Sequence, residues 1–347
     1  MTHFLDCLQR ELRLRAPDWA FGPLSSLYFG GGTPSLLSPD EIRQLVAAVE
    51  RLYGLQAGAE ITLEANPNHL TDAYVRALRD TGVNRLSIGI QSFSDEVLRR
   101  IRRRHTARQA EDALEFAEKY GFTRLSADLI CGLPGSSLAQ WEQDMRRVAH
   151  LPHLSCYQLT LEEGTALHRQ CAKGLETLPS EEETETQYLR MLSLLSEAGF
   201  THYEVSNFCK GEEWSRHNMA YWEGAPYFGF GPAAHSYAPH RRRWNVADVA
   251  AYCEALSAPD AASFSWYGEE SLSPDMEYEE YVMLSLRTFR GCDLDKIRRN
   301  WGEGRLEHLL SQLRQFPASH YLLSTQRLVL TEQGLRFADA IAAAMFV

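Results

Sequence analysis

The sequence predicts an α/β fold in which parallel strands form a barrel or partial barrel. Short β-rich apolar runs alternate with longer amphipathic segments between residues 27 and 205, which is the order of a parallel sheet with crossover helices. Six such units fit a (β/α)6 partial barrel better than an open doubly wound sheet, because no Gly-rich fingerprint runs directly into a helix. Periodicity alone leaves the open sheet as an alternative.

Strands and helices alternate in a regular order. The expected strands are Leu27–Phe29, Glu60–Glu64, Arg85–Ile90, Arg124–Ile130, Tyr157–Leu161 and His202–Val205. The expected helices span residues 39–53, 71–80, 95–104, 107–120, 136–149 and 180–198. Ser38 is the expected N-cap of the first of these helices, with Pro39 at its first position.

Composition and charge limit the classes of function. The 347 residues are 44% hydrophobic and 23% charged, which is ordinary for a cytosolic globular protein. No apolar run reaches the ~18 residues of a membrane span, and the start lacks the features of a signal peptide, so we expect a cytoplasmic protein. The net charge of −11 argues against nucleic-acid binding, whereas local arginine groups permit small anionic ligands.

The cysteines do not form a recognisable ligand set. There are seven, widely spaced, and no two of them stand in a C-x2-C or C-x3-C arrangement. An odd number at wide spacing makes a disulfide framework improbable, and no compact zinc or iron–sulfur site is evident from the sequence.

The pattern changes after residue 206, which predicts three regions. Residues 1–206 form the barrel, and residues 207–248 are rich in Gly, His and aromatic side chains and are expected to form an extended loop or hairpin. Residues 249–347 form a small, mostly helical C-terminal domain, for which a winged-helix form is one option. Within it, residues 322–331 are expected to form a short hairpin, and residues 331–345 a final helix.

Candidate ligand-binding residues follow the expected strands, because barrel sites lie at strand carboxyl ends. The first strand ends in Gly30-Gly31-Gly32-Thr33-Pro34, whose bare backbone permits close approach of a ligand or merely a tight turn. Glu64 and Gln91 end the next two strands, and both have alternatives as caps or rim residues. Asp128 lies within an apolar strand, where a carboxylate is costly unless it is paired.

Two further segments carry candidate side chains. The helix preceding His105 holds a dense arginine run in which Arg103 or Arg104 is placed to pair with a carboxylate, although most such runs are solvated. The segment from His217 to Trp222 and the residues around His235 combine histidine with flat rings, as a porphyrin site needs. Arg241, Arg242 and Arg243 lie near enough in sequence to meet porphyrin propionates. Core packing is the alternative for the aromatic region.

These motifs together resemble a known family. Gly30-Gly31-Gly32-Thr33-Pro34, Glu64-Ala65-Asn66-Pro67, Gly89-Ile90-Gln91-Ser92-Phe93, Asp128 through Gly135 and Tyr203 through Phe208 follow the order of the coproporphyrinogen-oxidase-like branch of the radical SAM superfamily. The segment His217-Asn218-Met219-Ala220-Tyr221-Trp222 matches the H-N-x-x-Y-W motif of the heme chaperone HemW family.

The resemblance implies a partial barrel that binds S-adenosylmethionine, a [4Fe–4S] cluster and heme. Gly31, Gly32 and Thr33 would then cradle the methionyl part of S-adenosylmethionine, and its other polar groups would be contacted by Glu64, Gln91, Arg103 and Asp128. By the same resemblance His217 would be the heme-iron ligand, and Tyr221, Trp222 and His235 would bind heme or line its site.

One departure from the family is large. Its C-x3-C-x2-C loop follows the first barrel strand, and neither that strand nor those cysteines are present here. Residues 3–15 resemble the helix that comes after the loop. Two explanations stay open: the sequence given starts downstream of that segment, which we favour, or the chain is a clusterless paralogue. Loss of the first strand would expose the Leu27 strand as an edge, predicting low solubility or a homo-oligomer.

The leading functional hypothesis is a heme chaperone that transfers heme to apo-proteins such as respiratory enzymes, with peripheral membrane association left open. The rivals are an oxygen-independent coproporphyrinogen III oxidase, which is an enzyme of porphyrin synthesis, and a clusterless binding paralogue. Whether the chain is an enzyme is therefore not decided by its sequence.

Overall fold

A computed structural model describes residues 2–259 and 266–347. The chain forms two compact units. One comprises residues 26–46 and 58–215, and is called the sheet unit; the other comprises the described parts of residues 1–25, 47–57 and 216–347, and is called the terminal unit.

A seven-stranded sheet, to which the sheet unit contributes most residues, confirms the predicted α/β partial barrel. Its strands are β1 (Leu24–Phe29), β2 (Leu55–Ala65), β3 (Arg85–Gln91), β4 (Arg124–Cys131), β5 (His153–Gln158), β6 (Phe200–Glu204) and β7 (Asn207–Lys210). Their order in the sheet is β1-β2-β3-β4-β5-β7-β6. Strands β2 to β5 pair with one another in parallel, whereas β7 is antiparallel to both of its neighbours.

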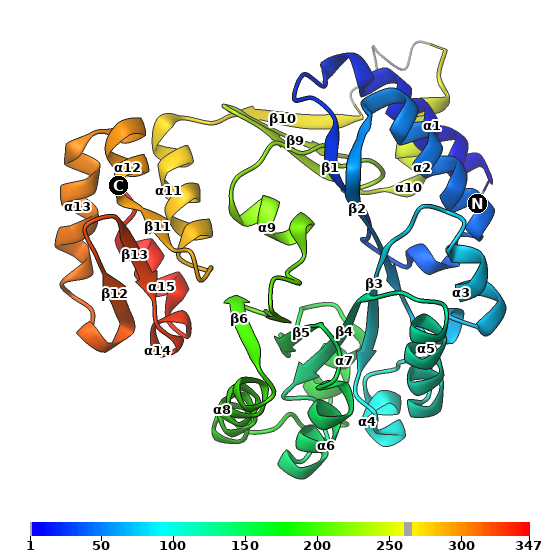
Figure 1. The fold of residues 1–347 in the computed structure, drawn as a ribbon, viewed down its shortest axis with the longest axis horizontal. Helices are drawn as coiled ribbons and strands as arrows, with labels where there is room; N and C mark the ends of the chain where they lie inside the picture. The colour runs from blue at the N-terminus through cyan, green and yellow to red at the C-terminus, as the bar shows by residue number, and fades with distance from the viewer. Residues whose placement is uncertain (1, 260–265) are drawn as a thin grey trace. The chain divides into compact units, whose positions relative to one another are not determined.

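Helices connect the parallel strands and cover the sheet. They are α2 (Pro39–Tyr53), α3 (Asp72–Leu78), α4 (Asp95–Arg100), α5 (Ala107–Lys119), α6 (Leu138–Val148), α7 (Ala166–Ala172) and α8 (Glu181–Glu197). Figure 1 shows α3, α5, α6 and α8 around the outer side of the curled sheet. Strands β3 and β4 form the centre of the core, where Leu86, Ile88 and Ile90 are fully buried, as expected for strands covered on both faces.

Several boundaries differ from the predictions; strand β2, for example, begins at Leu55 rather than Glu60. Strand β5 begins at His153 rather than Tyr157, because its buried residues form a continuous run and the alternation that follows belongs to a loop. Helix α4 ends at Arg100 rather than Arg104, since Arg102 adopts a left-handed conformation with φ of 56°. The predicted final helix is two short helices with a break after Arg336.

The terminal unit contains two three-stranded sheets and several helices. Its elements are α1 (Thr2–Arg15), α9 (Arg216–Trp222), β8 (His235–Ala238), β9 (Arg241–Asn245), α10 (Val249–Ser257), β10 (Tyr267–Ser271), α11 (Pro274–Ser285), β11 (Cys292–Asp293), α12 (Leu294–Trp301), α13 (Glu303–Leu313), β12 (Tyr321–Leu323), β13 (Arg327–Leu330), α14 (Glu332–Leu335) and α15 (Ala338–Ala344). The sheets have the orders β10-β9-β8 and β11-β13-β12. The expected hairpin near the C-terminus is the β12–β13 pair.

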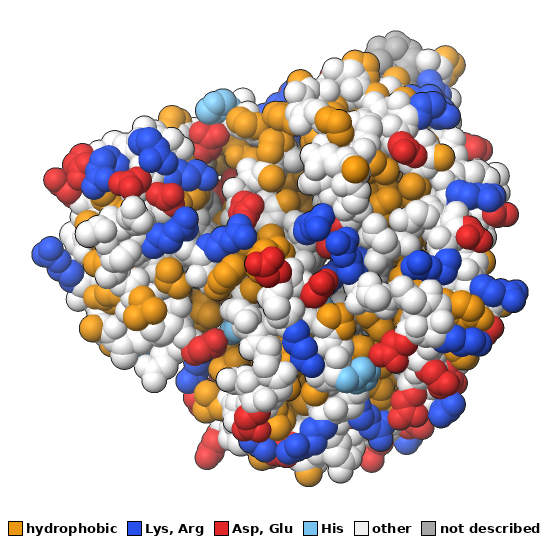
Figure 2. Space-filling view, in the orientation of Figure 1, with side chains coloured by type: hydrophobic (Ala, Val, Ile, Leu, Met, Phe, Trp, Pro, Cys, Tyr) orange, Lys and Arg blue, Asp and Glu red, His pale blue; other side chains and the backbone are white. Residues whose placement is uncertain are grey.

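The protein surface carries charges of both signs. Basic and acidic side chains are intermixed on the face drawn in Figure 2, where local pairing limits extended fields of one sign. Among the described residues, no helix is both long and apolar enough to cross a membrane.

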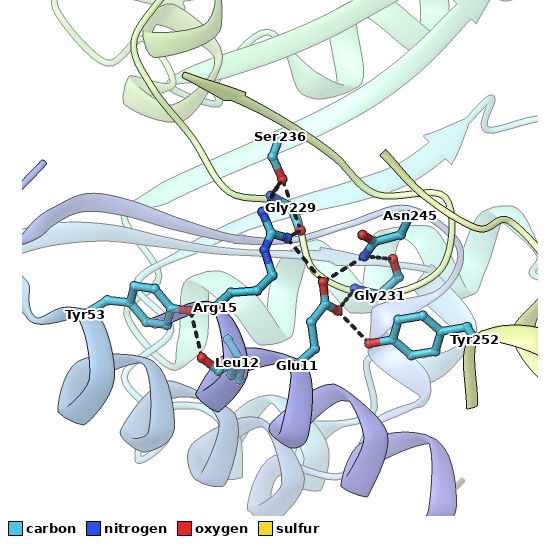
Figure 3. Close-up of polar contacts among 9 residues, drawn as sticks. All are labelled: Glu11, Leu12, Arg15, Tyr53, Gly229, Gly231, Ser236, Asn245 and Tyr252. Atoms are coloured by element: carbon cyan, nitrogen blue, oxygen red, sulfur yellow. Dashed lines mark hydrogen bonds and ion pairs between the residues drawn. The ribbon is translucent and has the colours of Figure 1, made fainter. Parts of the chain in front are cut away.

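A buried ion pair organises the terminal unit. Glu11 is 0% exposed and accepts hydrogen bonds from Tyr252 Oη at 2.6 Å, the Gly231 amide at 2.8 Å and Asn245 Nδ2 at 2.8 Å. Its fourth donor is Arg15 Nη1 at 3.2 Å. Figure 3 shows this carboxylate at the centre of its donors, which come from α1, α10, β9 and the loop before β8. Both carboxylate oxygens are therefore satisfied, which a buried charge requires.

We expect Glu11→Ala to destabilise the protein, because it leaves the Arg15 guanidinium buried without its counter-charge. Breaking a buried pair typically costs about 3–5 kcal/mol. Urea unfolding of the whole protein measures this loss in the free energy of unfolding. Asp295→Ala is the control, since its pair with Arg298 is nearly half exposed and exposed pairs contribute at most about 1 kcal/mol. Equal losses in both variants would contradict the assigned role of Glu11.

Candidate functional site

Polar side chains gather at the carboxyl ends of β1 to β4 in the sheet unit. In the parallel register, Glu64 lies opposite Ser87 and Gly89 lies opposite Asp128. Neighbouring parallel strands end at the same edge of a sheet, so the side chains at these positions face one region. Four of the predicted residues, Glu64, Gln91, Arg103 and Asp128, are connected there by the contacts described next.

The glycine loop after β1 is a bare stretch of backbone. Gly31 and Gly32 have φ values of 70° and 113°, and a Cβ atom at either position would meet open space. Gly30 is different, because a Cβ atom there would lie 2.5 Å from the Tyr28 ring. The loop is held against the end of β2 by Ser35, whose hydroxyl accepts a hydrogen bond from the Asn66 amide at 3.1 Å. The loop therefore presents peptide groups, with no side chain, at Gly31 and Gly32.

Glu64 has a fixed neighbour. The Tyr28 hydroxyl donates a 2.6 Å hydrogen bond to Glu64 Oε1. Burial, and then the Glu64 charge, raise the pKa of Tyr28 well above its usual range, so the phenol stays a donor at neutral pH. Tyr28 thus orients the carboxylate of Glu64, which is half-buried.

Asp128 is a carboxyl group with a shifted acidity. Ser87 Oγ donates a 2.9 Å hydrogen bond to Asp128 Oδ1. Burial raises the pKa of Asp128 to about 6, an effect opposed by hydrogen bonds from Ser87 and Ser155 and reinforced by the charge of Glu64. Desolvation and a nearby like charge both disfavour the ionised form. Such a perturbed carboxyl group at a strand end is typical of a functional site.

The side chains of Gln91 and Arg103 both lie near Gly89. A Cβ atom at Gly89 would lie 3.0 Å from Gln91 Nε2 and 3.8 Å from Arg103 Nη2. Gln91 is buried and has a φ of 68°, at a register irregularity between β3 and β4. Arg103 Nη1 donates to Asn66 Oδ1 at 3.3 Å, and burial lowers the pKa of Arg103 while Asp128 opposes that shift. Left-handed backbone at a non-glycine residue stores strain, often at functional positions.

Thr33 follows the bare glycines, and its hydroxyl makes no capping hydrogen bond to the turn that begins at Pro34. No role was predicted for Tyr28 or Ser87 from the sequence, although both lie in expected strands. Both are found only through the strand pairing that sets them beside Glu64 and Asp128. Asn66 likewise joins the site through Arg103 rather than through any spacing signal.

The histidine segment lies in the terminal unit, on the short helix α9. The ring of His217 is half-buried, and its centroid is 4.7 Å from that of Tyr221 in an edge-on arrangement. Tyr221 in turn meets Tyr227 at 4.4 Å, and burial raises the pKa of Tyr221 to about 12. Tyr227 and Tyr237 exchange backbone hydrogen bonds of 2.9 Å. A row of aromatic rings therefore continues from His217 to the β8–β9 hairpin.

The other two predicted aromatic-region residues occupy different places. Trp222 ends α9 and is half-buried. His235 begins β8 and is exposed; it stands opposite Trp244 in the register, with ring centroids 6.4 Å apart. That His235 and His217 line one heme site therefore stays a prediction.

Comparisons with known proteins identify the fold. Residues 9–148 match the family model of the Radical SAM superfamily. The chain is 23% identical to coproporphyrinogen III oxidase (HemN) from Escherichia coli, described as a radical SAM enzyme, with a TM-score of 0.84 over 99% of this chain and 82% of that one. At that identity the likeness establishes the fold. The chain therefore belongs to the class of proteins with a radical SAM fold.

Two relatives of similar sequence identify the family to which the chain belongs. The chain is 36% identical to the heme chaperone HemW of Lactococcus lactis subsp. lactis, over 80% of this chain and 73% of that protein. It is 30% identical to the heme chaperone HemW of Bacillus subtilis, over 96% of this chain and 88% of that protein. The chain belongs to the heme chaperone HemW family.

The cysteines of the described chain do not supply the ligand set of a [4Fe–4S] cluster. Such a cluster needs several convergent thiolates, whereas the seven cysteines are free thiols, six of them buried. Within residues 2–259 and 266–347, the converging group of histidine, cysteine and acidic ligands is His3, Cys7 and Cys253. With two thiols in this group, these residues do not fit a [4Fe–4S] cluster.

The raised pKa of Asp128 predicts a pH-dependent stability. The folded protein retains a proton that the unfolded chain releases between about pH 4 and pH 6. The contribution of this group to the free energy of unfolding therefore falls as the pH rises through that window, and is constant above it. Asp128→Asn should remove this contribution, so that the variant gains stability relative to the wild type between pH 4 and pH 7, measured by urea unfolding.

Ser87→Ala provides the complementary measurement. The hydrogen bond from Ser87 stabilises the ionised carboxylate of Asp128. Its loss in Ser87→Ala should therefore raise the pKa of Asp128 further and extend the pH range over which stability falls to higher pH. A stability difference between wild type and Asp128→Asn that is the same at every pH would contradict the assignment.

Proposed function

We propose that this protein is a heme chaperone that binds heme through the His217 segment and delivers it to apo-hemoproteins, and that it binds S-adenosylmethionine at the strand ends of the sheet unit. Membership of the HemW family at 30–36% identity over most of the chain is the observation that carries the proposal. The half-buried His217 ring beside Tyr221 supports it, because histidine is a common axial ligand of heme iron.

For heme, the chain offers one ligand and a means of orienting it. His217 and Tyr221 are one helical turn apart on α9, so they share a face of the helix. The edge-on tyrosine restricts rotation of the imidazole, while Tyr221 itself is 39% exposed and available to pack against a macrocycle.

For S-adenosylmethionine, the strand-end residues match the charges of the ligand. Its amine and sulfonium are cationic, and Glu64 and Asp128 are the carboxyl groups of the site. Its carboxylate is complemented by Arg103 and by the peptide groups of Gly31 and Gly32. Gln91 offers both a donor and an acceptor, and Thr33 a hydroxyl. Bound S-adenosylmethionine supplies a reactive sulfonium; the residues named here bind and orient it.

We expect His217→Ala to weaken hemin binding by about tenfold or more, because an iron ligand is removed. The Soret band of hemin titrated into the purified protein measures this. His150→Ala is the matched control, since His150 is an exposed histidine of the sheet unit. An unchanged Soret band and affinity in His217→Ala would exclude this histidine as the ligand.

For the second site, Glu64→Gln should weaken S-adenosylmethionine binding by about tenfold, because a charge-assisted hydrogen bond becomes a neutral one. Glutamine still accepts from Tyr28, so the local structure should persist. Equilibrium dialysis measures the effect, and Glu115→Gln on the exposed face of α5 is the control. A wild-type chain that takes up no S-adenosylmethionine would overturn this half of the proposal.

A further inference from the structure

Three side chains of types that bind metal ions converge between α1 and α10 in the terminal unit, and none of them belongs to either site described above. They are His3 and Cys7 of α1 and Cys253 of α10, and one ligand atom of each lies within 4.8 Å of the others. Both cysteines are buried, whereas His3 is exposed. The sequence gives no sign of this group, because Cys7 and Cys253 are 246 positions apart.

Each of the two helices presents one pair of side chains to this group. His3 and Cys7 are four residues apart, as are Cys253 and Ser257, so each pair lies on one face of its helix. Ser257 Oγ is 3.5 Å from His3 Nε2 and 3.6 Å from Cys7 Sγ. Four side chains thus converge, two from each helix, and three of them are strong ligands for zinc.

The polar contacts of the Cys7 thiol are weak. Cys7 Sγ lies 3.6 Å from the Cys253 carbonyl oxygen and 3.6 Å from Ser257 Oγ, and sulfur is a poor hydrogen-bonding atom. Bonds from the thiolates to a metal ion would therefore replace little. Apolar packing explains a single buried cysteine, but it does not explain an imidazole and a hydroxyl group beside two thiols.

Other contacts hold α1 and α10 together. Glu11 lies one turn beyond Cys7 and accepts the 2.6 Å hydrogen bond from Tyr252 Oη. At the far end of α10, Arg10 Nη2 donates to the Pro259 carbonyl oxygen at 3.2 Å. The helical turns that carry the ligands are therefore fixed near one another before an ion binds, which lowers the entropy lost on binding.

The ligand types favour zinc. Zn²⁺ binds thiolate sulfur at about 2.3 Å and imidazole nitrogen at about 2.0 Å in a tetrahedron, so its ligand atoms lie roughly 3.5–3.8 Å apart. Ligand atoms within 4.8 Å of one another reach that spacing by side-chain rotation. Magnesium and calcium prefer oxygen ligands. Two thiolates also neutralise the double charge of zinc, so no net charge is buried.

We propose that His3, Cys7 and Cys253 form a zinc site that joins α1 to α10, with the Ser257 hydroxyl or a water molecule at the fourth position. His3 and Ser257 are exposed and provide the side from which the ion enters. Binding converts both thiols to thiolates and releases their two protons to solvent. The site requires neither heme nor S-adenosylmethionine, so it stands apart from the proposed function.

The first test measures zinc binding to the fully reduced protein, in competition with a chromophoric chelator. We expect the wild type to bind one zinc ion per chain, and Cys253→Ser and His3→Ala to bind it at least about tenfold more weakly. His3→Ala guards against misfolding, because its side chain is exposed. The matched controls are Cys171→Ser and His150→Ala in the sheet unit, which should bind zinc as the wild type does.

Cobalt(II) bound in place of zinc provides a second readout. Its thiolate-to-metal absorption should fall by about half in Cys7→Ser, because one of two thiolate ligands is lost. A reduced wild type that takes up no zinc would overturn the site, whether or not an oxidised sample forms a disulfide between Cys7 and Cys253. Zinc affinity and cobalt absorption that are unchanged in the cysteine and histidine variants would overturn it as well.

Discussion

The carboxylate of Glu11 is the interaction on which the terminal unit depends. It joins residues far apart in sequence, since its donors Gly231, Asn245 and Tyr252 follow it by more than 200 positions. Its partner Arg15 reaches the carbonyl of Gly229 at 2.6 Å and Ser236 Oγ at 2.8 Å. One buried ion pair therefore fixes α1 against the region of the β8–β9 hairpin. Because each of these hydrogen bonds has a buried partner, disrupting the pair disturbs several elements of the terminal unit together.

The two units differ in how fully the polar groups described above are stabilised. In the terminal unit, Glu11 is fully satisfied and acts as a structural anchor. At the strand ends of the sheet unit, Asp128 resists ionisation, Gln91 stands in a left-handed conformation and Arg103 is partly desolvated. These costs lie at neighbouring positions along β3 and β4 and the turn after α4. Strain and unfavourable charge persist only where the surrounding fold enforces them, and their concentration at one edge is typical of a site prepared for a ligand.

Much of the architecture was predictable from local patterns. The alternation of strands and helices indicated the partial barrel, and the strand-end rule selected Glu64, Gln91 and Asp128, which the register then brought to one edge. The antiparallel placement of β7 and the early start of β5 were not predictable, because a strand buried on both faces lacks a period. The network around Glu11 was also not predictable, because its donors Gly231, Asn245 and Tyr252 reach it only through tertiary contacts that no spacing in the sequence indicates.

The run Arg241-Arg242-Arg243 shows how strand register can decide between a structural and a binding role. In the antiparallel pairing of β9 with β10, Arg242 lies directly opposite Glu270, and their ion pair holds that register. A slip of one residue would turn every side chain to the other face, so that Arg242 would lose Glu270 and Glu280, and Arg241 and Arg243 would take its place. By pairing with the middle arginine of the run, the two glutamates therefore favour the observed register over the slipped one.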